Sequence, residues 1–349
     1  MKKKFKATVF IGRFQPIHNG QLHAIETALK SSETIILVVG SYNRAKSIKN
    51  PFSYSERVQI IKDAIVDQYK GVFSILDRIK FVSVRDYLYN DYKWTSEIYS
   101  KCIEAGATDD ENTQLIGCMK DDASYHLRMF PKWEFNRIPY VNWIDATNIR
   151  NEWYETGKIN RYRDALSPST LQLMEQQPLR SDDWFKLLLN EYEFLKSHDE
   201  MWKNVPYPVT FTTVDALVIR SGCVLVVKRG TQLGYGQYAL PGGYINPKET
   251  LLNGMLRELK EETKITVPPH VLKNSIEEVK VFDHPKRSLR GRIITHVHLI
   301  NLGHGELPDV KGGDDANSAH WLPVADVLQN ENQFFEDHYD IIVNMISKY

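Results

Sequence analysis

Three glutamates within a short span are the residues of this sequence best placed to do chemistry. Glu258, Glu261 and Glu262 stand at positions i, i+3 and i+4 in the run GYINPKETLLNGMLRELKEETKI, residues 243–265. A helix would place all three carboxylates on one face, where they repel one another unless a cation lies between them. Such hard oxygen ligands suit Mg²⁺, with Mn²⁺ as the alternative. A solvated acidic helix face is the other interpretation of such a run.

The residues around these glutamates fit the same kind of site. Arg257 lies eight positions after Glu249, so its guanidinium could pair with that carboxylate. Pro241, Gly242 and Gly243 form a loop directly before the run. We expect Gly242 and Gly243 to take part in binding substrate, and the Gly242 carbonyl to be a further metal ligand.

The spacing of the whole run resembles the Nudix box of diphosphate hydrolases, G-x5-E-x7-R-E-U-x-E-E-x-G-U with U aliphatic. Every fixed position matches except the last glycine, which is Lys264 here. The resemblance implies that Glu258, Glu261 and Glu262 are catalytic and hold Mg²⁺. Lysine in the left-handed conformation usual for that glycine costs about 1 kcal/mol. We therefore expect a local change where the chain leaves the helix, and no loss of chemistry.

A second candidate site lies near the N-terminus. Residues 5–12 read as a buried strand, residues 12–21 as a loop of sequence GRFQPIHNGQ, and the following residues to about 30 as a helix with one apolar face. The N–H groups at a helix start carry a partial positive charge and bind phosphate. The candidate binding residues of this loop and helix start are Gly12, Arg13, Phe14, His18 and Gln21.

GRFQPIHNG resembles the GRFQPxHxGH signature of nicotinamide-mononucleotide (NMN) adenylyltransferases, within the HxGH nucleotidyltransferase superfamily. Gln21 stands where the second histidine is expected; its amide donates hydrogen bonds but carries no charge. Three further segments resemble that family in order: NPFSYSER, GCMKDDASY and IDATNIR, which are residues 50–57, 117–125 and 144–150. In the last of them Asp145 replaces the usual serine.

This resemblance implies that the first domain joins NMN to ATP, giving NAD⁺ and pyrophosphate, with Mg²⁺ on the outer phosphates. His18 and Arg150 would be catalytic, stabilising the α-phosphate transition state and the leaving pyrophosphate. Trp94 is the candidate for stacking on the nicotinamide ring, with an ordinary core aromatic as the alternative. The other substrate-binding residues expected outside the loop are Arg57, Asp121, Thr147 and Asn148.

Length and composition favour a two-domain enzyme that acts on small molecules. The chain has 349 residues, and 44 basic residues balance 44 acidic ones, so nothing indicates general nucleic-acid binding. There is no signal peptide and no apolar run of about 18 residues, so we expect a cytoplasmic protein without a membrane partner. The three cysteines lack metal spacing and suit a reducing compartment. The oligomeric state stays open, a homo-oligomer included.

Alternating patterns predict an α/β protein in three parts. In the first part, strands at 5–12, 34–41, 79–84, 113–118 and 139–143 alternate with helices at 23–30, 54–68, 95–105 and 125–130. This alternation predicts a doubly wound parallel sheet in a nucleotidyltransferase domain, residues 1–180. Residues 181–205 follow as a helical connector. Residues 206–349 form an α+β Nudix domain with strands at 209–219, 223–229, 238–240, 277–282 and 292–301 and a final helix at 333–348.

Segments after the Nudix box indicate ADP-ribose as the second substrate, beside ATP and NMN for the first domain. Residues 282–292, 313–316 and 335–338 resemble the ADP-ribose branch, which usually reads RDPRGR where this chain reads RSLRGR. Arg287, Arg290 and Arg292 are the candidate diphosphate ligands, with a loop role as the alternative. The domain could instead be a silent ADP-ribose sensor or act on another nucleoside diphosphate. For the first domain, another HxGH transferase is the alternative, and an oxidoreductase lacks any GxGxxG after a strand.

Overall fold

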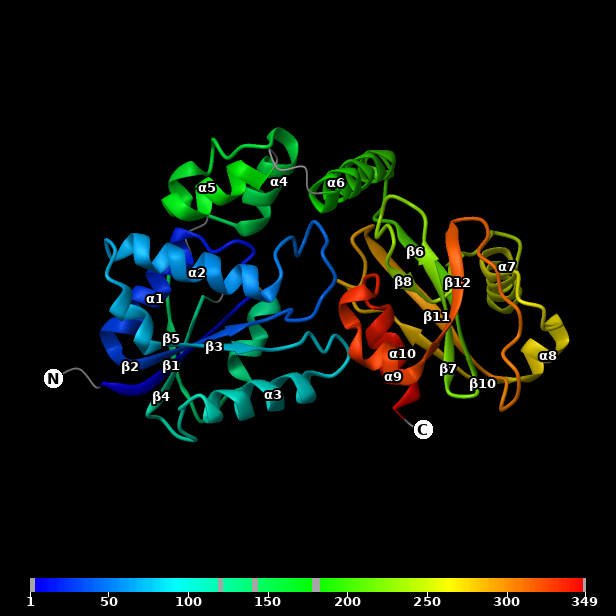
Figure 1. Ribbon diagram of the computed structural model, residues 1–349, viewed down its shortest axis with the longest axis horizontal. Coiled ribbons are helices and arrows are strands. Elements are labelled where there is room, and N and C mark those ends of the chain that lie inside the picture. The colour runs from blue at the N-terminus through cyan, green and yellow to red at the C-terminus, as the bar shows by residue number, and fades with distance from the viewer. Residues whose placement is uncertain (1–3, 119–121, 140–143, 178–182, 348–349) are drawn as a thin grey trace. The chain divides into compact units, whose positions relative to one another are not determined.

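Short apolar strands build the sheet of the first unit. The computed structural model describes residues 4–118, 122–139, 144–177 and 183–347, and its contacts divide it into two units, Met1–Leu188 and Leu189–Tyr349 (Figure 1). In the first unit the strand order is β3-β2-β1-β4-β5 and every pair is parallel. The strands are β1 Phe5–Gly12, β2 Ser32–Val39, β3 Ile79–Ser83, β4 Thr113–Gly117 and β5 Glu134–Arg137.

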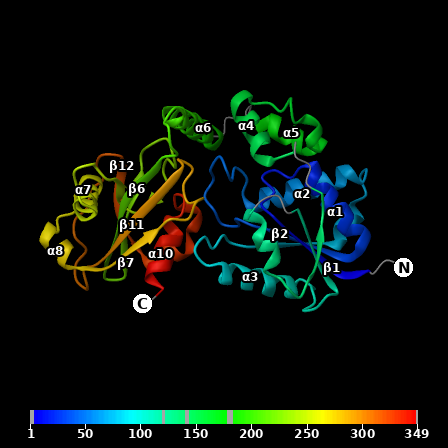
Figure 2. The same ribbon diagram turned by 180° about the vertical axis from the view of Figure 1, so that it is seen from behind.

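Helices cover both faces of this sheet. In both views α1 and α2 lie on one face and α3 on the other (Figures 1 and 2). The predicted doubly wound parallel sheet is therefore confirmed. The helices are α1 Asn19–Ser31, α2 Tyr54–Gln68, α3 Asp91–Glu104, α4 Ala146–Thr156 and α5 Pro168–Gln176, with short 3₁₀ helices at Phe73–Arg78, Asp122–Arg128 and Arg163–Ala165.

The predicted elements of this unit differ from the structure at its weakest patterns. The strand expected at 139–143 falls mostly on residues outside the described part of the chain. The observed edge strand is β5, whose four residues EFNR are polar or exposed and give little periodic signal. The helix expected at 125–130 is a 3₁₀ helix over Asp122–Arg128. A run of apolar side chains in β1, β2 and β4 packs against α3 in the core.

The second unit is a mixed sheet between helices, as predicted for the Nudix domain. Its order is β10-β11-β6-β7-β12, with β8 on β7 and β9 on β6, and among the strands of the described residues only β11 and β6 pair in parallel. In Figure 1, α7 and α8 lie on one side of the sheet and α9 and α10 on the other, and Figure 2 shows the same for α7, α8 and α10. The strands are β6 Thr210–Arg220, β7 Cys223–Arg229, β8 Tyr238–Ala239, β9 Gly242–Tyr244, β10 Ile276–Phe282, β11 Arg292–Asn301 and β12 Ala316–Pro323.

The helices of this unit show one wrong boundary. They are α7 Leu251–Thr263, α8 Pro269–Asn274, α9 Val324–Gln329 and α10 His338–Ile346. The final helix was expected from residue 333, but α10 begins at His338. The reason is local: Glu336 has φ +43°, a left-handed conformation that cannot continue a right-handed helix.

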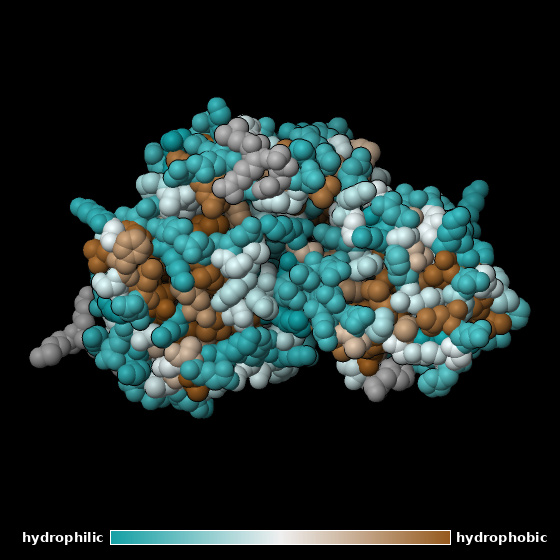
Figure 3. All heavy atoms as spheres, in the orientation of Figure 1, coloured by the Kyte–Doolittle hydropathy of each residue, from teal (hydrophilic) through white to brown (hydrophobic). Residues whose placement is uncertain are grey.

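Helix α6, Asp183–Trp202, spans the junction between the two units. Its first residues pack in the first unit, where the Phe185 and Trp153 rings lie 4.7 Å apart. The expected boundaries at 180 and 205 stay a prediction, because the division by contacts falls inside this helix. Hydrophilic side chains predominate on the face drawn in Figure 3, with hydrophobic ones in separate patches. Within the described residues, every helix is too short or too polar to cross a membrane.

Candidate active sites

A cavity of about 440 Å³ opens where β1 and β4 of the first unit end. The carboxyl ends of parallel strands are where doubly wound sheets bind ligands. The cavity brings together residues from the two predicted motifs that are more than a hundred positions apart in the chain. Its lining includes Arg13, Phe14, His18, Gly20 and Gln21 from the first motif and Asp145, Thr147 and Arg150 from the last.

His18 and Gln21 lie at the start of α1, as the first motif predicts. His18 is the residue before the helix, and its carbonyl accepts hydrogen bonds from the Gln21 and Leu22 N–H groups at 2.9 and 3.0 Å. A side chain at position 20 would come within 3.2 Å of the His18 imidazole, so glycine there lets the ring lie over the helix start. The Gln21 side-chain oxygen is buried and has no hydrogen-bond partner within the described residues. The amide thus has unused hydrogen-bonding capacity.

Arg150 reaches the cavity from α4 and is nearly buried, with 4% of its surface exposed. It donates to the Gln15 carbonyl at 2.6 Å and the Ile48 carbonyl at 3.0 Å. Burial lowers the pKa of its guanidinium to about 10, so the group stays charged at neutral pH. A third contact is to the Thr147 hydroxyl at 3.3 Å, and the three together leave some of its five N–H groups for a ligand. Asp145 caps α4 by accepting from the Thr147 N–H at 2.7 Å, which explains why an acid is tolerated here.

Arg57 does not line the cavity and serves the fold instead. Its side chain is 1% exposed and donates to the Arg13, Gly40 and Ser41 carbonyls at 2.7, 2.6 and 3.1 Å. The predicted contact of Arg57 with substrate is therefore corrected. The guanidinium joins the ends of β1 and β2, because buried carbonyls need donors and this arginine supplies them. Its pKa falls to about 10, mainly through burial.

Three other expected residues, Gly12, Trp94 and Asn148, are not among those that line the cavity. The Trp94 ring packs against His126 and Phe130 with ring centres 5.7 and 6.3 Å apart, which favours the core interpretation over nicotinamide stacking. Asn148 is exposed on α4 and is not part of the lining. Gly12 leaves room for the Phe14 ring, which a Cβ would approach to 2.9 Å. Asp121 lies outside the described residues.

The structure adds His126 to the cavity wall. Sequence reasoning missed it, although GCMKDDASY ends only one residue before it. A histidine one position beyond a recognised segment carries no spacing signal of its own, and only the fold brings it to the same cavity as the loop after β1.

Replacement of Gln21 tests whether this amide acts as a neutral phosphate donor. Gln21→Ala should lower adenylyl transfer about 10- to 100-fold, the size of one lost hydrogen bond to a charged group, while Gln21→His should keep it. Steady-state assays of dinucleotide formation measure both. Gln59→Ala, an exposed glutamine on α2, is the matched control. Unchanged kinetics in Gln21→Ala would show that the residue is not in the site.

In the second unit, α7 presents the three glutamates of the Nudix run on one face, as predicted. Glu258 and Glu262 are nearly buried, and the Glu262 carboxylate accepts from the Gly242 N–H at 2.9 Å. The expected ion pair of Arg257 with Glu249 is confirmed at 2.6 Å. Arg257 also contacts Glu258 at 2.7 Å and Glu261 at 3.0 Å. The helix thus carries one arginine that partly neutralises the acidic face.

Burial disfavours the ionised form of the carboxylates on this acidic face. Desolvation raises the pKa of Glu262 to about 8 and is also the main cause of the raised pKa of Glu258. Hydrogen bonding to Arg257 lowers the pKa of Glu249 to about 2. Buried like charges of this kind are stabilised by a cation.

The donor set fits a divalent metal, although the described acidic, histidine and cysteine side chains form no group of three around a single point. Arg257 accounts for the difference, because its guanidinium draws Glu258 and Glu261 to itself. The three oxygen donors that would hold the ion are the carboxylates of Glu258, Glu261 and Glu262. A Cβ at Gly243 would come within 2.8 Å of the Glu258 carboxylate, so the glycine loop lies directly against this face.

The expected change at Lys264 is wrong. Lys264 itself takes the left-handed conformation, with φ +48°, and its N–H donates to the Lys260 carbonyl. The helix therefore ends as it would with glycine. A segment much later in the chain holds this backbone conformation, because the Lys311 and Gly313 N–H groups donate to the Thr263 and Glu262 carbonyls at 2.8 and 3.1 Å.

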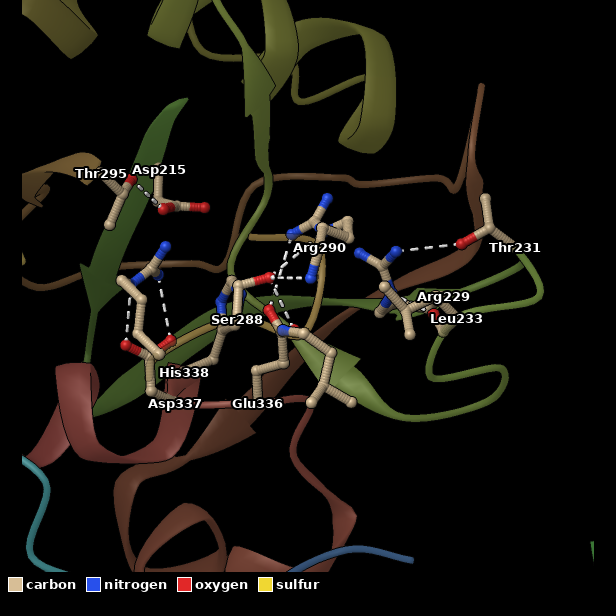
Figure 4. Close-up of polar contacts among 12 residues, drawn as sticks. Asp215, Arg229, Thr231, Leu233, Ser288, Arg290, Thr295, Glu336, Asp337 and His338 are labelled. Carbon is tan, nitrogen blue, oxygen red and sulfur yellow. Dashed lines mark hydrogen bonds and ion pairs between the residues drawn. The ribbon is translucent and has the colours of Figure 1, made fainter. Parts of the chain in front are cut away.

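A second cavity, of about 380 Å³, lies within this unit. Arg290 lines it, and its role as a diphosphate ligand stays a prediction. Arg287 and Arg292 do not line it: Arg287 pairs with the buried Asp337, and Arg292 contacts Asp283 on its own loop. Arg229 at the end of β7 lines it as well and was missed by sequence reasoning. Arg229 donates to the Thr231 hydroxyl at 3.0 Å (Figure 4). Its guanidinium lies 4.1 Å from the Phe335 ring centre. Its pKa is lowered, first by burial and next by the neighbouring Arg290.

Aromatic side chains form another wall of this cavity. They come from the second half of α6 and from β6 and β9: Phe194, His198, Trp202, Phe211 and Tyr244. Trp202 and Phe211 meet edge to face at 5.0 Å, and Phe211 and Tyr244 at 5.6 Å. Trp202 and Tyr244 remain about 40% exposed, so their rings have surface left for a ligand. Aromatic faces beside arginines suit a planar base linked to phosphate.

Comparison with known proteins agrees with both sites. The cytidylyltransferase-like family model matches residues 9–107 and the NUDIX domain model matches residues 209–344. A bifunctional NMN adenylyltransferase/ADP-ribose pyrophosphatase from Francisella tularensis is 32% identical, and its structure matches over 99% of each chain with a TM-score of 0.91. A second structure of that description, complexed with AMP and a manganese ion, matches with a TM-score of 0.88 and 31% identity, again over 99% of both chains.

The chain belongs to this bifunctional family. Single-activity relatives match each half by itself. The nicotinamide/nicotinic acid mononucleotide adenylyltransferase of Acinetobacter baylyi is 34% identical over 54% of this chain and 94% of its own length. The ADP-ribose pyrophosphatase of Methanocaldococcus jannaschii is 33% identical over 37% of this chain and 69% of its own.

Proposed function

We propose that this chain is a bifunctional enzyme that makes NAD⁺ from NMN and ATP and hydrolyses ADP-ribose to AMP and ribose 5-phosphate. For the first activity, the main support is that the 440 Å³ cavity brings His18, Gln21, Thr147 and Arg150 to one edge of the parallel sheet. For the second, the support is a buried acidic face on α7 within the same unit as a cavity with two arginines and an aromatic wall.

Adenylyl transfer needs no covalent enzyme intermediate, so the first unit mainly positions the two substrates and neutralises the charge of their phosphates. The 5′-phosphate oxygen of the mononucleotide attacks the α-phosphorus of ATP in line, and pyrophosphate leaves. His18 at the start of α1 and the charged Arg150 would stabilise the negative charge on the α-phosphate and the leaving group. Thr147 and the helix starts add neutral donors, and Mg²⁺ on the outer phosphates would shield their charge.

In the second unit, Glu258, Glu261 and Glu262 would hold Mg²⁺, with Mn²⁺ as the alternative, and the bound ion would supply an activated water and offset the charge of the diphosphate. Arg229 and Arg290 would bind the diphosphate oxygens. The aromatic wall of the cavity would take the base. Arg257 keeps the acidic helix face in place through Glu249.

A substrate panel for each site tests the proposal, run with Mg²⁺ and with Mn²⁺. The first site should form a dinucleotide from ATP and at least one of nicotinamide and nicotinic acid mononucleotide. The second should release AMP from ADP-ribose. Failure of both mononucleotides refutes the first activity. Binding of ADP-ribose without AMP release would favour a silent sensor, and neither binding nor release would indicate another nucleoside diphosphate.

A further inference from the structure

Glu336 is held in a backbone conformation that side-chain-bearing residues rarely adopt. Its φ is +43°, yet its side chain is only 7% exposed. Such outliers persist where the surrounding structure over-determines them, and they gather at functional sites. Both neighbours are fixed: the Phe335 N–H donates to the Tyr238 carbonyl at 2.8 Å, and Asp337 forms a buried two-bond ion pair with Arg287 at 2.9 and 3.0 Å.

The Glu336 carboxylate binds the loop that carries Arg290 through hydrogen bonds and an ion pair (Figure 4). One of its oxygens accepts from the Ser288 hydroxyl and from the Leu289 N–H, each at 2.8 Å. The other lies 3.5 Å from the Arg290 guanidinium. Ser288 in turn accepts from the Arg290 backbone and side chain at 3.3 Å. The carboxylate therefore sets the position of three consecutive loop residues.

Arg290 is the loop residue that faces the cavity. Its guanidinium lies 5.6 Å from the Tyr244 ring centre and 5.9 Å from that of Phe335. Arg229 lines the same cavity, so two cations stand near one another. The negative charge of Glu336 offsets this repulsion on one side and leaves the cavity side of Arg290 for an anion.

Ser288 and Leu289 are the two positions at which this loop departs from RDPRGR, and both departures supply donors to Glu336. An aspartate at 288 would set a second carboxylate against the first at hydrogen-bond distance. A proline at 289 would have no N–H to donate. The loop residues Ser288 and Leu289 therefore supply the two hydrogen-bond donors that the Glu336 carboxylate accepts.

We propose that Glu336 is a positioning residue for the hydrolase: it fixes the 288–290 loop so that Arg290 meets the substrate diphosphate. The identity of that substrate rests on the proposed function above. Arg290 makes the contact, and Glu336 acts only through it.

Kinetics of Glu336 variants separate positioning from a general role in folding. Glu336→Ala should raise KM for ADP-ribose about 10- to 100-fold with kcat within about threefold, because uniform binding is lost. Glu336→Gln keeps an acceptor but loses the charge and should fall between. Glu277→Gln makes the same chemical change at an exposed position on β10 and is the control. A fall in kcat with KM unchanged would overturn the proposal.

A double-variant cycle tests whether the loop position 288 and Glu336 act through their mutual contact. Ser288→Asp alone should raise KM at least tenfold, through repulsion from Glu336. Adding Glu336→Gln to it should restore most of the affinity, since the new aspartate then faces a neutral amide. Equal effects of Ser288→Asp in both backgrounds would contradict the proposal.

Calorimetry keeps this inference separate from the hydrolysis assay. Binding of ADP-ribose and of inorganic diphosphate is measured for the wild-type chain and the Glu336 variants. A larger dissociation constant in Glu336→Ala supports positioning even if the wild-type chain releases no AMP. The absence of AMP release would refute only the proposed function. An unchanged constant for both probes, or no binding of either by the wild-type chain, overturns the positioning role.

Discussion

Glu262→Gln should cut AMP release from ADP-ribose by about two orders of magnitude or more. The substitution keeps the shape of the side chain and its acceptor for the Gly242 N–H, which lies 2.9 Å away. It removes one charged oxygen ligand from the face of α7, and metal chemistry depends on that charge. A coupled assay of AMP with Mg²⁺ measures the loss.

Two comparisons make this result specific. NAD⁺ formation by the same preparation should be unchanged, because the first cavity is lined by residues of the other unit. Glu306→Gln, at an exposed glutamate, should leave both activities intact. Wild-type hydrolysis in Glu262→Gln would remove Glu262 from the catalytic set.

The same variant should stabilise the protein when a chelator removes divalent metal. Burial raises the pKa of Glu262 from 4.5 to about 8, so the folded state holds its proton more tightly than the unfolded state. The ionised form is thus disfavoured on folding, and wild-type stability falls as pH rises from 4.5 toward 8. Glu262→Gln lacks this loss and should gain roughly 1 to a few kcal/mol at pH 8 and nothing near pH 4.

His18→Ala should lower NAD⁺ formation about 100- to 1000-fold, the typical cost of losing one donor to transition-state charge. The imidazole stands at the start of α1 on the wall of the 440 Å³ cavity, on the same lining as Arg150. The effect should appear in kcat more than in KM, because the charge on the α-phosphate grows during the reaction.

His23→Ala is the control for this loss. His23 lies on the same helix five positions later, with 63% of its side chain exposed, and contacts only Glu26 among the described ion pairs. It should leave NAD⁺ formation unchanged. Equal activity of His18→Ala and His23→Ala would refute the role of His18.

The sequence alone determined both folds and the outline of each site, because these depend on short-range pattern. The GRFQPIHNG loop after an apolar strand predicts the phosphate-binding turn at β1. The spacing of Glu258, Glu261 and Glu262 predicts one helix face, and the Glu249–Arg257 pair follows from the same helix. Residues within two helical turns or one strand–turn unit report directly on one another.

Tertiary structure decided which arginine does what. Arg57 and Arg150 both stand in recognised segments, and sequence placed both at the first site. The Arg57 guanidinium donates to the Arg13, Gly40 and Ser41 carbonyls. These three carbonyls lie 16 to 44 positions away in the chain, beyond the range of any periodic pattern. Arg150, by contrast, has N–H groups left for a ligand in the cavity that it lines.

Tertiary structure alone also assembled the second cavity. Arg229, Arg290 and Trp202 come from β7, the loop after β10 and the end of α6, and no spacing rule connects them. The left-handed Glu336 is a further case, since sequence placed it inside a helix. Its conformation is set by Tyr238, Arg287 and the 288–290 loop, contacts that exist only after distant strands have paired and closed the sheet.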